Sequence, residues 1–539
     1  MSFPPPPETK EPMPVEEGKK FLHWHILGGN NKHRIGANCG LCTYTETDAD
    51  GRRRTSTVMF DAGLMFGDAK TPEDPALAES DTVIPDLSRF FEKVDDPSHV
   101  PEQKVDAICL THSHSDHLGA LPYMTLMGHK LPRIYATPYT VKRLEQEYSN
   151  MGVPADEWPE ILEIAPGKPV QEGDISVTAF WVSHSTPQSV GFFVETPEGN
   201  ILNPGDFKLD QTVVWGPAFS PDQFERVVSK PVDVLLLDST GADRDIKPVT
   251  EGDMRDTLRE LMEKHPKKRF VVAVMGGFEE NTASVAQVAA ENGRTLWVSG
   301  WSHEQALSAL KETGMTLSDS IGQDVDLRIV SGARAVRDLE AQKPGEGVIV
   351  VTGAQGKPNA ALTRAVDGRH KDLKLDPKKD VVLFCAPNIP GQEAGRYRLL
   401  YNLAAQGFKV YTRKEADLYP HAHARLPEIR EMAKMAQAKT VVPIHGDENL
   451  RRHNAAAMEA MGQKALLVEN GDVLRISKDG CHSTNPTTKG APKLIGFKTL
   501  QGNHWTDRHF MMTRAPQKGP APVNDNTGRR PKIFDIGPK

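Results

Sequence analysis

One short segment, residues 111–117, concentrates side chains that bind metal ions. It reads Thr-His-Ser-His-Ser-Asp-His, so three imidazoles and one carboxylate fall within six residues. Imidazole and carboxylate groups are ligands that Zn²⁺ accepts. A polar loop that is rich in histidine by chance would rarely reach this density. The segment therefore predicts a metal centre that uses His112, His114, Asp116 and His117.

Three further candidate ligands follow strand-like runs elsewhere in the chain. His184 follows the alternating run 175–182, Asp206 follows an apolar pair at 201–202, and His445 follows the apolar pair 441–442. Ligand sites of α/β folds gather at the carboxyl ends of strands. Each residue alone could equally be a hydrogen-bonded loop residue. Together with the histidine segment, they supply enough ligands for two metal ions.

The elements that must position these residues alternate along the chain. Strand-like runs lie at 56–61, 105–110, 175–182, 232–237, 270–274, 348–351, 381–384 and 441–444. Helix-like patterns lie at 118–127, 250–264, 303–312 and 393–405, and Thr250 with Asp253 forms a capping-box pattern. This alternation predicts an α/β architecture in which helices cover sheets. Glu279 and Glu280, outside these patterns, are interpreted as a polar loop.

Composition excludes several classes of protein. A length of 539 residues with 38% hydrophobic residues indicates two or three globular domains. Five cysteines exclude a disulfide scaffold and fit a reducing cytoplasm, and Cys39 with Cys42 is interpreted as a pair of buried thiols. The N-terminus lacks a secretory apolar segment, and no run approaches a membrane span. A net charge of −7 excludes a globally basic nucleic-acid binder, although a local basic groove stays open.

The two ends of the chain differ in character. Residues 1–20 are rich in Pro and Glu and are expected to be a disordered tail. Residues 478–539 carry eleven Lys and Arg against four Asp and Glu and are rich in Pro and Gly. Two interpretations of this basic C-terminal tail stay open, a solvated disordered segment or an electrostatic arm for RNA phosphates.

The complete set of candidate ligands resembles the metallo-β-lactamase superfamily, in which Asp61 would match an earlier aspartate motif. About 240 residues separate Asp206 from His445, which is room for an inserted domain as in the β-CASP nucleases. Within that group the chain resembles the ribonuclease J family. The matching stretches are 81–88, 112–122, 203–208, 236–240, 352–358, 388–393 and 444–446.

The resemblance implies a four-layer αββα sandwich with an inserted β-CASP α/β domain. The expected parts are an N-terminal tail at 1–20, the first part of the metallo-β-lactamase domain at 21–246, the β-CASP domain at 247–428, the second part of the metallo-β-lactamase domain at 429–477 and the basic tail at 478–539. It also implies a cytoplasmic enzyme without a membrane segment that binds RNA and forms a homodimer or homotetramer.

The implied activity is hydrolysis of RNA phosphodiester bonds by a zinc-dependent ribonuclease, as a 5′-to-3′ exonuclease, an endonuclease or both, in RNA processing and decay. Two Zn²⁺ ions are expected, with Mn²⁺ or Mg²⁺ as alternatives in activity, and a hydroxide shared between two ions would attack phosphorus. His112, His114 and His184 would hold one ion, Asp116, His117 and His445 the other, and Asp206 would bridge them. Asp61 would orient the histidine segment from outside the ligand set.

The resemblance also suggests catalytic and substrate-binding residues. Asp116 would orient or deprotonate water, His423 would donate a proton to the leaving oxygen, and Asp238 would orient or charge-balance His423. Substrate would be bound by His423, Ser239, Gly353 and Gln355, although the glycine-rich turn at 353–356 could equally be a plain strand-to-helix turn.

The chain departs from the family pattern at one functional segment. A His-Val-Ser-Gly-His-type segment is replaced by Tyr-Pro-His-Ala-His at 419–423. Two other functions stay open. One is a metallo-β-lactamase-fold hydrolase of DNA or another ester, which substrate preference would reveal. The other is a catalytically silent RNA-binding scaffold, which would bind RNA without turnover.

Overall fold

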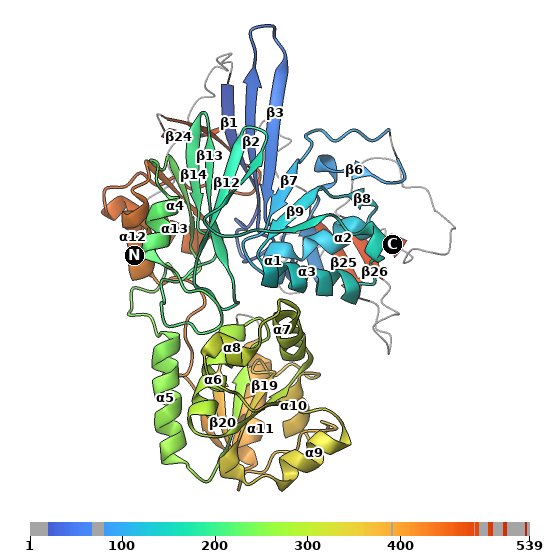
Figure 1. Cartoon of the computed structure of the whole chain (residues 1–539), viewed down its shortest axis with the longest axis vertical. Helices are drawn as coiled ribbons and strands as arrows, with labels where there is room; N and C mark the ends of the chain where they lie inside the picture. Colours follow the sequence, from blue (N-terminus) through green and yellow to red (C-terminus); the bar gives the residue numbers. More distant parts are fainter. Residues whose placement is uncertain are drawn as a thin grey trace.

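The computed structural model describes residues 20–66, 80–96, 98–389, 392–478, 480–484, 494–499, 510–514 and 534–535. The predicted N-terminal tail therefore lies outside the described residues, apart from Lys20. Two lobes are visible, an upper one that holds most of the strands and a lower one built from the middle of the chain (Figure 1).

Two sheets face each other in the upper lobe. The first has eight strands in the order β10 (Ile161–Glu163), β9 (Arg133–Ala136), β7 (Ala107–Cys109), β3 (Arg53–Phe60), β2 (Cys39–Thr47), β1 (Lys20–Gly28), β23 (Val473–Ser477) and β24 (Gly480–Thr484). The second has six, in the order β11 (Pro169–Glu172), β12 (Ile175–Trp181), β13 (Val190–Thr196), β14 (Gly199–Asn203), β15 (Val234–Asp238) and β22 (Thr440–Ile444). Trp24, Phe60 and Phe192 pack between them, with ring centroids 5.1 and 5.6 Å apart.

Helices cover the outer faces of both sheets. The buried residues of α1 (Ser115–Leu118), α2 (Ala120–Leu126) and α3 (Pro138–Asn150) join one hydrophobic cluster with the first sheet. Those of α4 (Pro221–Val227), α12 (Leu426–Ala436) and α13 (Glu448–Ala460) join another with the second sheet. Because each sheet buries one face on its partner and the other on helices, the lobe is an αββα sandwich. The predicted fold class is confirmed.

The lower lobe has a parallel sheet of its own. Its order is β18 (Leu327–Ile329), β17 (Thr295–Ser299), β19 (Gly347–Thr352), β16 (Arg269–Val274), β20 (Asp380–Cys385) and β21 (Lys409–Tyr411). Alternate residues of its central strands fall into two separate hydrophobic clusters, because both faces are covered. The lobe's helices are α5 (Glu251–Lys264), α6 (Glu279–Glu291), α7 (Trp301–Glu312), α8 (Leu317–Ile321), α9 (Gly332–Ala341), α10 (Ala361–Val366) and α11 (Glu393–Ala405).

The lower lobe is inserted between two adjacent parallel strands of the upper lobe. The chain leaves at the end of β15, builds α5 through β21, and returns through α12 to β22, which pairs directly with β15. All eight strand-like runs predicted from the sequence are strands in the structure, and the predicted helix 250–264 has the Thr250–Asp253 capping box. The predicted span 247–428 contains all elements of the lower lobe and the first three residues of α12.

Part of the predicted C-terminal tail is ordered into strands. β24 pairs with β23, and β25 (Leu494–Thr499) pairs with β5 (Thr82–Pro85), where Ile495 is buried. β26 (Phe510–Arg514) and β27 (Phe534–Asp535) extend this sheet on one side and β4 (Met65–Phe66) on the other. The expectation of a solvated, mostly disordered tail stays a prediction for the rest of this segment. A two-stranded sheet of β6 (Glu92–Lys93) and β8 (His129–Lys130) completes the fold.

Candidate metal centre and cleft

The histidine segment spans a loop and the start of a helix. His112 and His114 lie on the loop after β7, whereas Asp116 and His117 lie on the first turn of α1. The sequence placed all four on the loop and predicted one helix at 118–127; the structure instead has α1 and α2, separated at Gly119. The imidazole of His117 nevertheless lies close to that of His112, with ring centroids 4.0 Å apart.

Three imidazoles form the first cluster. His114 Nδ1 lies 3.0 Å from His112 Nε2 and 3.1 Å from His184 Nε2. A tetrahedral ion with bonds of about 2.1 Å would space its ligand atoms about 3.4 Å apart, so the three nitrogens suit one ion. Burial, helped by neighbouring imidazoles, lowers the pKa of His112 and His184 well below its ordinary value. Neutral imidazole is the form that binds metal.

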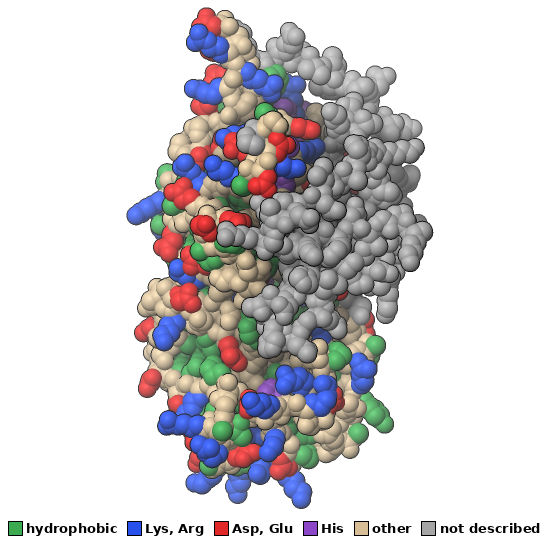
Figure 2. Space-filling view, turned by 90° about the vertical axis from the view of Figure 1, so that its right-hand side faces the viewer, with side chains coloured by type: hydrophobic (Ala, Val, Ile, Leu, Met, Phe, Trp, Pro, Cys, Tyr) green, Lys and Arg blue, Asp and Glu red, His purple; other side chains and the backbone are tan. Residues whose placement is uncertain are grey.

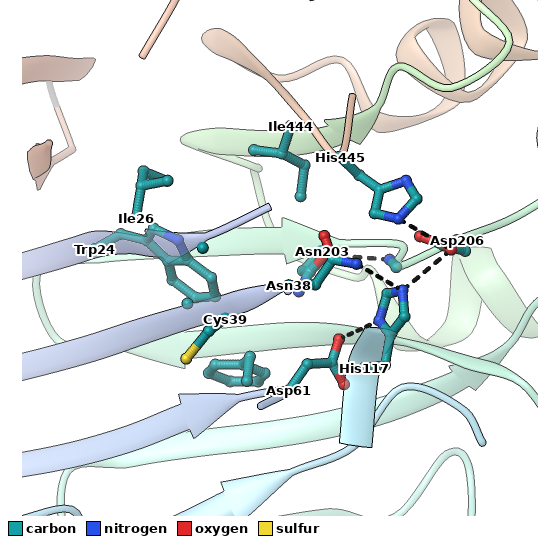
Figure 3. Close-up of a pocket in the computed structure, with 14 residues that line it drawn as sticks. Trp24, Ile26, Asn38, Cys39, Asp61, His117, Asn203, Asp206, Ile444 and His445 are labelled. Carbon is teal, nitrogen blue, oxygen red and sulfur yellow. Dashed lines mark hydrogen bonds and ion pairs between the residues drawn. The ribbon is translucent and has the colours of Figure 1, made fainter. Parts of the chain in front are cut away.

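The second cluster combines two carboxylates with two imidazoles. Asp206 Oδ2 lies 3.1 Å from His117 Nε2 and 3.5 Å from His445 Nε2 (Figure 3). Asp116 Oδ2 lies 3.4 Å from His445 Nε2. Asp206 Oδ2 also lies 3.9 Å from Nε2 of both His112 and His184. One oxygen atom therefore lies between both clusters, as a bridging ligand would.

The pKa values of the second cluster show how strongly it attracts positive charge. Burial would lower the pKa of His445, but Asp206, Asp116 and Asp238 outweigh burial and raise it to about 10. Burial would raise the pKa of Asp206, but the imidazoles, His117 first, hold it below its ordinary value. The carboxylates thus draw a proton onto imidazole in the metal-free protein. The donor set and its spacing fit two divalent ions.

Asp61 lies behind the histidine segment, where the sequence predicted an orienting residue. Its carboxylate accepts hydrogen bonds from the Thr111 amide at 2.8 Å and the Thr111 hydroxyl at 2.9 Å, and lies 2.9 Å from His117 Nδ1 (Figure 3). The backbone of Asp61 has a φ of 58°, and that of His445 has a φ of 51°. This left-handed region is strained for residues other than glycine.

A second group of side chains surrounds Asp238 at the end of β15. Asp238 Oδ2 lies 2.9 Å from His423 Nδ1, and Asp238 Oδ1 lies 3.2 Å from His445 Nδ1. The Thr240 hydroxyl lies 2.7 Å from the same His445 nitrogen. Asp238 is buried, whereas the His423 side chain is 23% exposed. Asp238 therefore positions two imidazoles, and His423 can reach a bound molecule.

Sequence reasoning missed two positioning residues. Asn38 Nδ2 donates to the Asp116 backbone oxygen at 3.1 Å and lies 3.0 Å from His117 Nε2. Thr240 contacts His445 as described above. Neither residue belongs to a ligand-like pattern, so only the folded contacts single them out.

A cavity of about 780 Å³ opens beside the clusters, between the two lobes. His114, Asp116, Asp206 and His423 line it from the upper lobe and from the segment that returns to it. Gly353 and Gln355 line it from the lower lobe, where the sequence predicted substrate contacts. Ser239, also predicted to bind substrate, does not line it: the residue is fully buried and its hydroxyl accepts a hydrogen bond from Asn454.

The altered segment at 419–423 turns its extra histidine away from this cavity. His421 Nε2 lies 2.7 Å from Glu428 Oε2, and its Nδ1 lies 2.8 Å from the Val249 backbone oxygen. Ala422 lines the cavity instead, and its backbone oxygen lies 2.8 Å from His184 Nδ1. In this segment, Ala422 therefore lines the cavity next to His423, whereas His421 contacts Glu428 on helix α12.

The prediction of a polar loop at Glu279 and Glu280 is wrong. Both residues open helix α6 and are 2% exposed. The Trp215 amide donates to Glu280 Oε2 at 3.1 Å, and burial raises the pKa of Glu280 well above its ordinary value. The two carboxylates lie at the junction of the lobes because the Glu280 amide donates to the Ser185 backbone oxygen at 3.1 Å.

Comparisons with known proteins agree with this architecture. Residues 81–271 match the family model described as a beta-lactamase superfamily domain, and residues 267–403 match the model described as the ribonuclease J beta-CASP domain. A solved protein of unknown function from Enterococcus faecalis shares the fold, with a TM-score of 0.58 and 15% identity over 84% of this chain and 100% of that one.

Curated relatives cover most of the chain. Ribonuclease J of Mycolicibacterium smegmatis is 26% identical over 77% of this chain and 69% of its own length. Ribonuclease J 1 of Streptococcus pyogenes is 28% identical over 78% and 70%, and ribonuclease J2 of Bacillus subtilis is 28% identical over 83% and 73%. With its αββα sandwich, inserted lobe and clustered ligands, the chain combines a beta-lactamase superfamily domain with a ribonuclease J beta-CASP domain, is similar to curated ribonucleases J over most of its length, and is a metal-dependent hydrolase.

Proposed function

We propose that the protein is a zinc-dependent ribonuclease that hydrolyses RNA phosphodiester bonds in RNA processing and decay. The observation that carries this proposal is the placement of two ligand clusters beside a cavity between the lobes, which His114, Asp116 and Asp206 line. The relatives named ribonuclease J support RNA as the substrate class. When two divalent ions are bound, they supply an activated water at neutral pH and neutralise charge on the phosphoryl oxygens.

The ligand assignment follows the distances. His112, His114 and His184 would hold one ion, and Asp116, His117 and His445 the other, with Asp206 as the bridge. Asp206, Asp238, His423 and His445 form a third group of ligand atoms within 4.8 Å, which overlaps the second cluster. We assign His423 to catalysis and not to ligation because its side chain is partly exposed to the cavity.

The chain's own residues would then divide the remaining work. The Asp116 carboxylate, at the cavity wall, orients the attacking water and accepts its proton. His423, held by Asp238, donates a proton to the leaving 3′ oxygen or stabilises its developing charge. Gly353 and Gln355 border the same cavity and would contact the substrate strand.

The surface offers modest help to RNA binding. Figure 2 shows Lys and Arg side chains interspersed with Asp and Glu over the described part of one face, and several of the basic side chains lie over the lower lobe. None of the helices in the described part of the chain has the length and apolar character of a membrane span. A cytoplasmic location and a homodimer or homotetramer stay predictions.

One experiment separates the modes of cleavage. We would incubate the purified protein with 5′-labelled RNA that carries a monophosphate or a triphosphate, with and without chelator, beside Asp116→Ala. Chelator-sensitive release of labelled mononucleotide from the monophosphate form is expected for a 5′-to-3′ exonuclease. Longer labelled fragments that are indifferent to the 5′ end indicate an endonuclease.

The same assay distinguishes the two alternatives. No cleavage of RNA, with cleavage of DNA or another ester, would make the protein a different metallo-hydrolase. Binding of RNA without turnover in added Zn²⁺ or Mn²⁺ would make it an RNA-binding scaffold. Either result overturns the proposal.

A further inference from the structure

The cavity wall near His114 carries a buried carboxylate and a half-buried guanidinium that no role described above uses. Arg143 reaches it from α3 in the upper lobe, and Glu279 reaches it from the start of α6 in the lower lobe. Glu279 is 2% exposed, and its Oε2 atom has no hydrogen-bond partner among the described residues. The Nε atom of Arg143 is also buried and has no partner within the described part of the chain.

The two groups face the same space without forming an ion pair. No nitrogen of Arg143 lies within 4.0 Å of a Glu279 oxygen, although Tyr139 and then Glu279 are close enough to raise the pKa of Arg143 against the effect of burial. The Nη1 atom of Arg143 donates to Gln146 at 2.8 Å, which fixes the guanidinium plane. Because a buried charged atom without a partner is costly, this arrangement favours a bound molecule that supplies the missing partners.

The mixed charge restricts the chemistry of that molecule. Glu279 would repel a phosphate group, and Arg143 would repel a cation. A neutral molecule that presents donors to the carboxylate and acceptors to the guanidinium satisfies both. Met275, Phe278 and Met151 line the same cavity, so the molecule would also have apolar surface on which to lie flat.

Among the RNA bases, guanine meets these conditions best. Its N1–H and its 2-amino group are adjacent donors that match the two oxygens of a carboxylate, whereas its O6 and N7 atoms are adjacent acceptors that match an arginine fork. Bases of single-stranded RNA expose both of these edges. Adenine, cytosine and uracil each lack at least one of the paired groups.

We propose that Arg143 and Glu279 form a guanine-recognition subsite beside the metal centre. Glu279 would accept hydrogen bonds from guanine N1–H and N2–H, and Arg143 would donate to O6 and N7. The subsite lies close to the reacting phosphate because the Gly277 backbone oxygen, two residues before Glu279, lies 2.7 Å from His114 Nε2. This inference rests on the proposed ribonuclease function and adds base preference to it.

The test measures base preference directly. Oligouridylates that carry one guanosine, adenosine, cytidine or inosine would be cleaved under single-turnover conditions. We expect the rate next to guanosine to exceed that next to adenosine by about tenfold, the effect of one good bidentate contact. Inosine, which lacks the 2-amino group, would lose most of that advantage. Equal rates for all four substrates would overturn the subsite.

Variants assign the preference to these residues. Glu279→Gln is expected to reduce the guanosine-to-adenosine ratio to below about threefold, since an amide cannot accept both hydrogen bonds. Arg143→Lys would reduce it as well and would abolish discrimination against 7-deazaguanosine. Glu291→Gln, at the other end of α6, is the matched control and keeps the wild-type ratio. A wild-type ratio in both Glu279→Gln and Arg143→Lys would contradict the assignment.

A separate measurement keeps this inference apart from the proposed function. If no RNA is cleaved, the ribonuclease proposal fails, and calorimetry of guanosine 5′-monophosphate against adenosine 5′-monophosphate on the wild-type protein still tests the subsite. Tighter binding of the guanosine nucleotide, lost in Glu279→Gln, supports recognition of guanine. Equal affinities overturn it.

Discussion

The carboxylate of Asp206 lies between two groups of imidazoles that come from distant parts of the chain. Its Oδ2 atom is within 4 Å of a nitrogen on His112, His117, His184 and His445. A carboxylate in this position would neutralise charge from two bound cations. The other candidate ligands form two groups, with His112, His114 and His184 in one and Asp116, His117 and His445 in the other.

Removal of Asp206 should therefore affect both ions. Asp206→Ala is expected to purify with less than half the metal content of the wild type, as measured by mass spectrometry. Both clusters would lose a ligand, and two bound cations would repel each other without a carboxylate between them. Asp245→Ala, which removes a surface carboxylate paired with Arg430, is the control. Full occupancy in Asp206→Ala would exclude the bridging role.

His423 should behave differently, because Asp238 and not a metal cluster holds it. His423→Ala is expected to retain wild-type metal content and to lose about 100-fold in kcat, the usual contribution of a general acid. His482→Ala, at an exposed position of strand β24, serves as the control. An unchanged kcat would end the assignment of His423, and a loss of metal would make it a ligand.

At the scale of elements, the junction of the two lobes depends on a buried polar network. Lys208 is fully buried, and its ammonium lies 3.1 Å from Glu251 and 3.5 Å from Asp210. The Ser284 hydroxyl donates to Glu251 at 2.8 Å. Lys208 follows Asp206 by two residues, so the segment that carries the bridging carboxylate is anchored on helices α5 and α6.

Glu280 makes this junction sensitive to pH. Burial, with Glu251, raises its pKa well above the ordinary value of 4.5. Between those two pKa values the unfolded chain binds fewer protons than the folded chain, so the free energy of unfolding falls as pH rises. Glu280→Gln removes this ionisation and keeps an acceptor for the Trp215 amide.

We therefore expect the Tm of Glu280→Gln, relative to wild type, to increase from pH 5 to pH 8. A gain of about 1 kcal/mol would raise the Tm of a chain of this length by about 1 °C. Scanning calorimetry at both pH values measures it, with Glu291→Gln as the control on the same helix. A difference in Tm that does not change with pH would contradict the buried, protonated state of Glu280.

The sequence predicted the strands well because apolar runs and their flanking polar residues are local signals. It also singled out candidate ligands whose donor atoms the structure brings together, because most of them follow a strand end; their role as ligands stays a prediction. It did not predict that Glu279 and Glu280 begin a buried helix, because their partners Ser185 and Trp215 are remote in sequence. The roles of Asn38 and Thr240, and the burial of Ser239, also depend on tertiary contacts.

At the scale of the whole molecule, the chain crosses between lobes beside the metal centre. Asp238 ends β15, just before the chain enters the lower lobe, and His423 lies on the segment by which it returns. Their contact at 2.9 Å therefore joins the exit and the entry of the insertion. A motion of one lobe relative to the other would first change the position of His423 and the shape of the cavity wall.

Metal binding should stabilise the entire fold. Ions that bind the native state add free energy of about 2.7 kcal/mol at a hundredfold excess over Kd. Dialysis against a chelator is therefore expected to lower Tm by about 2 °C or more, and Zn²⁺ should restore it. Asp206→Ala should show little response to chelator. An unchanged Tm in the wild type would argue against resident ions.

The left-handed backbone at Asp61 and His445 has a consequence for the history of the family. At both positions glycine would relieve about 1 kcal/mol of backbone strain, so the functional side chains are retained although their backbone conformation is unfavourable. The hydrogen bonds from Thr111 to Asp61, and the contact of His445 with Asp238, offset this strain. A relative with glycine at either position would lack a side chain of the metal centre, which would indicate an active site that has lost its activity.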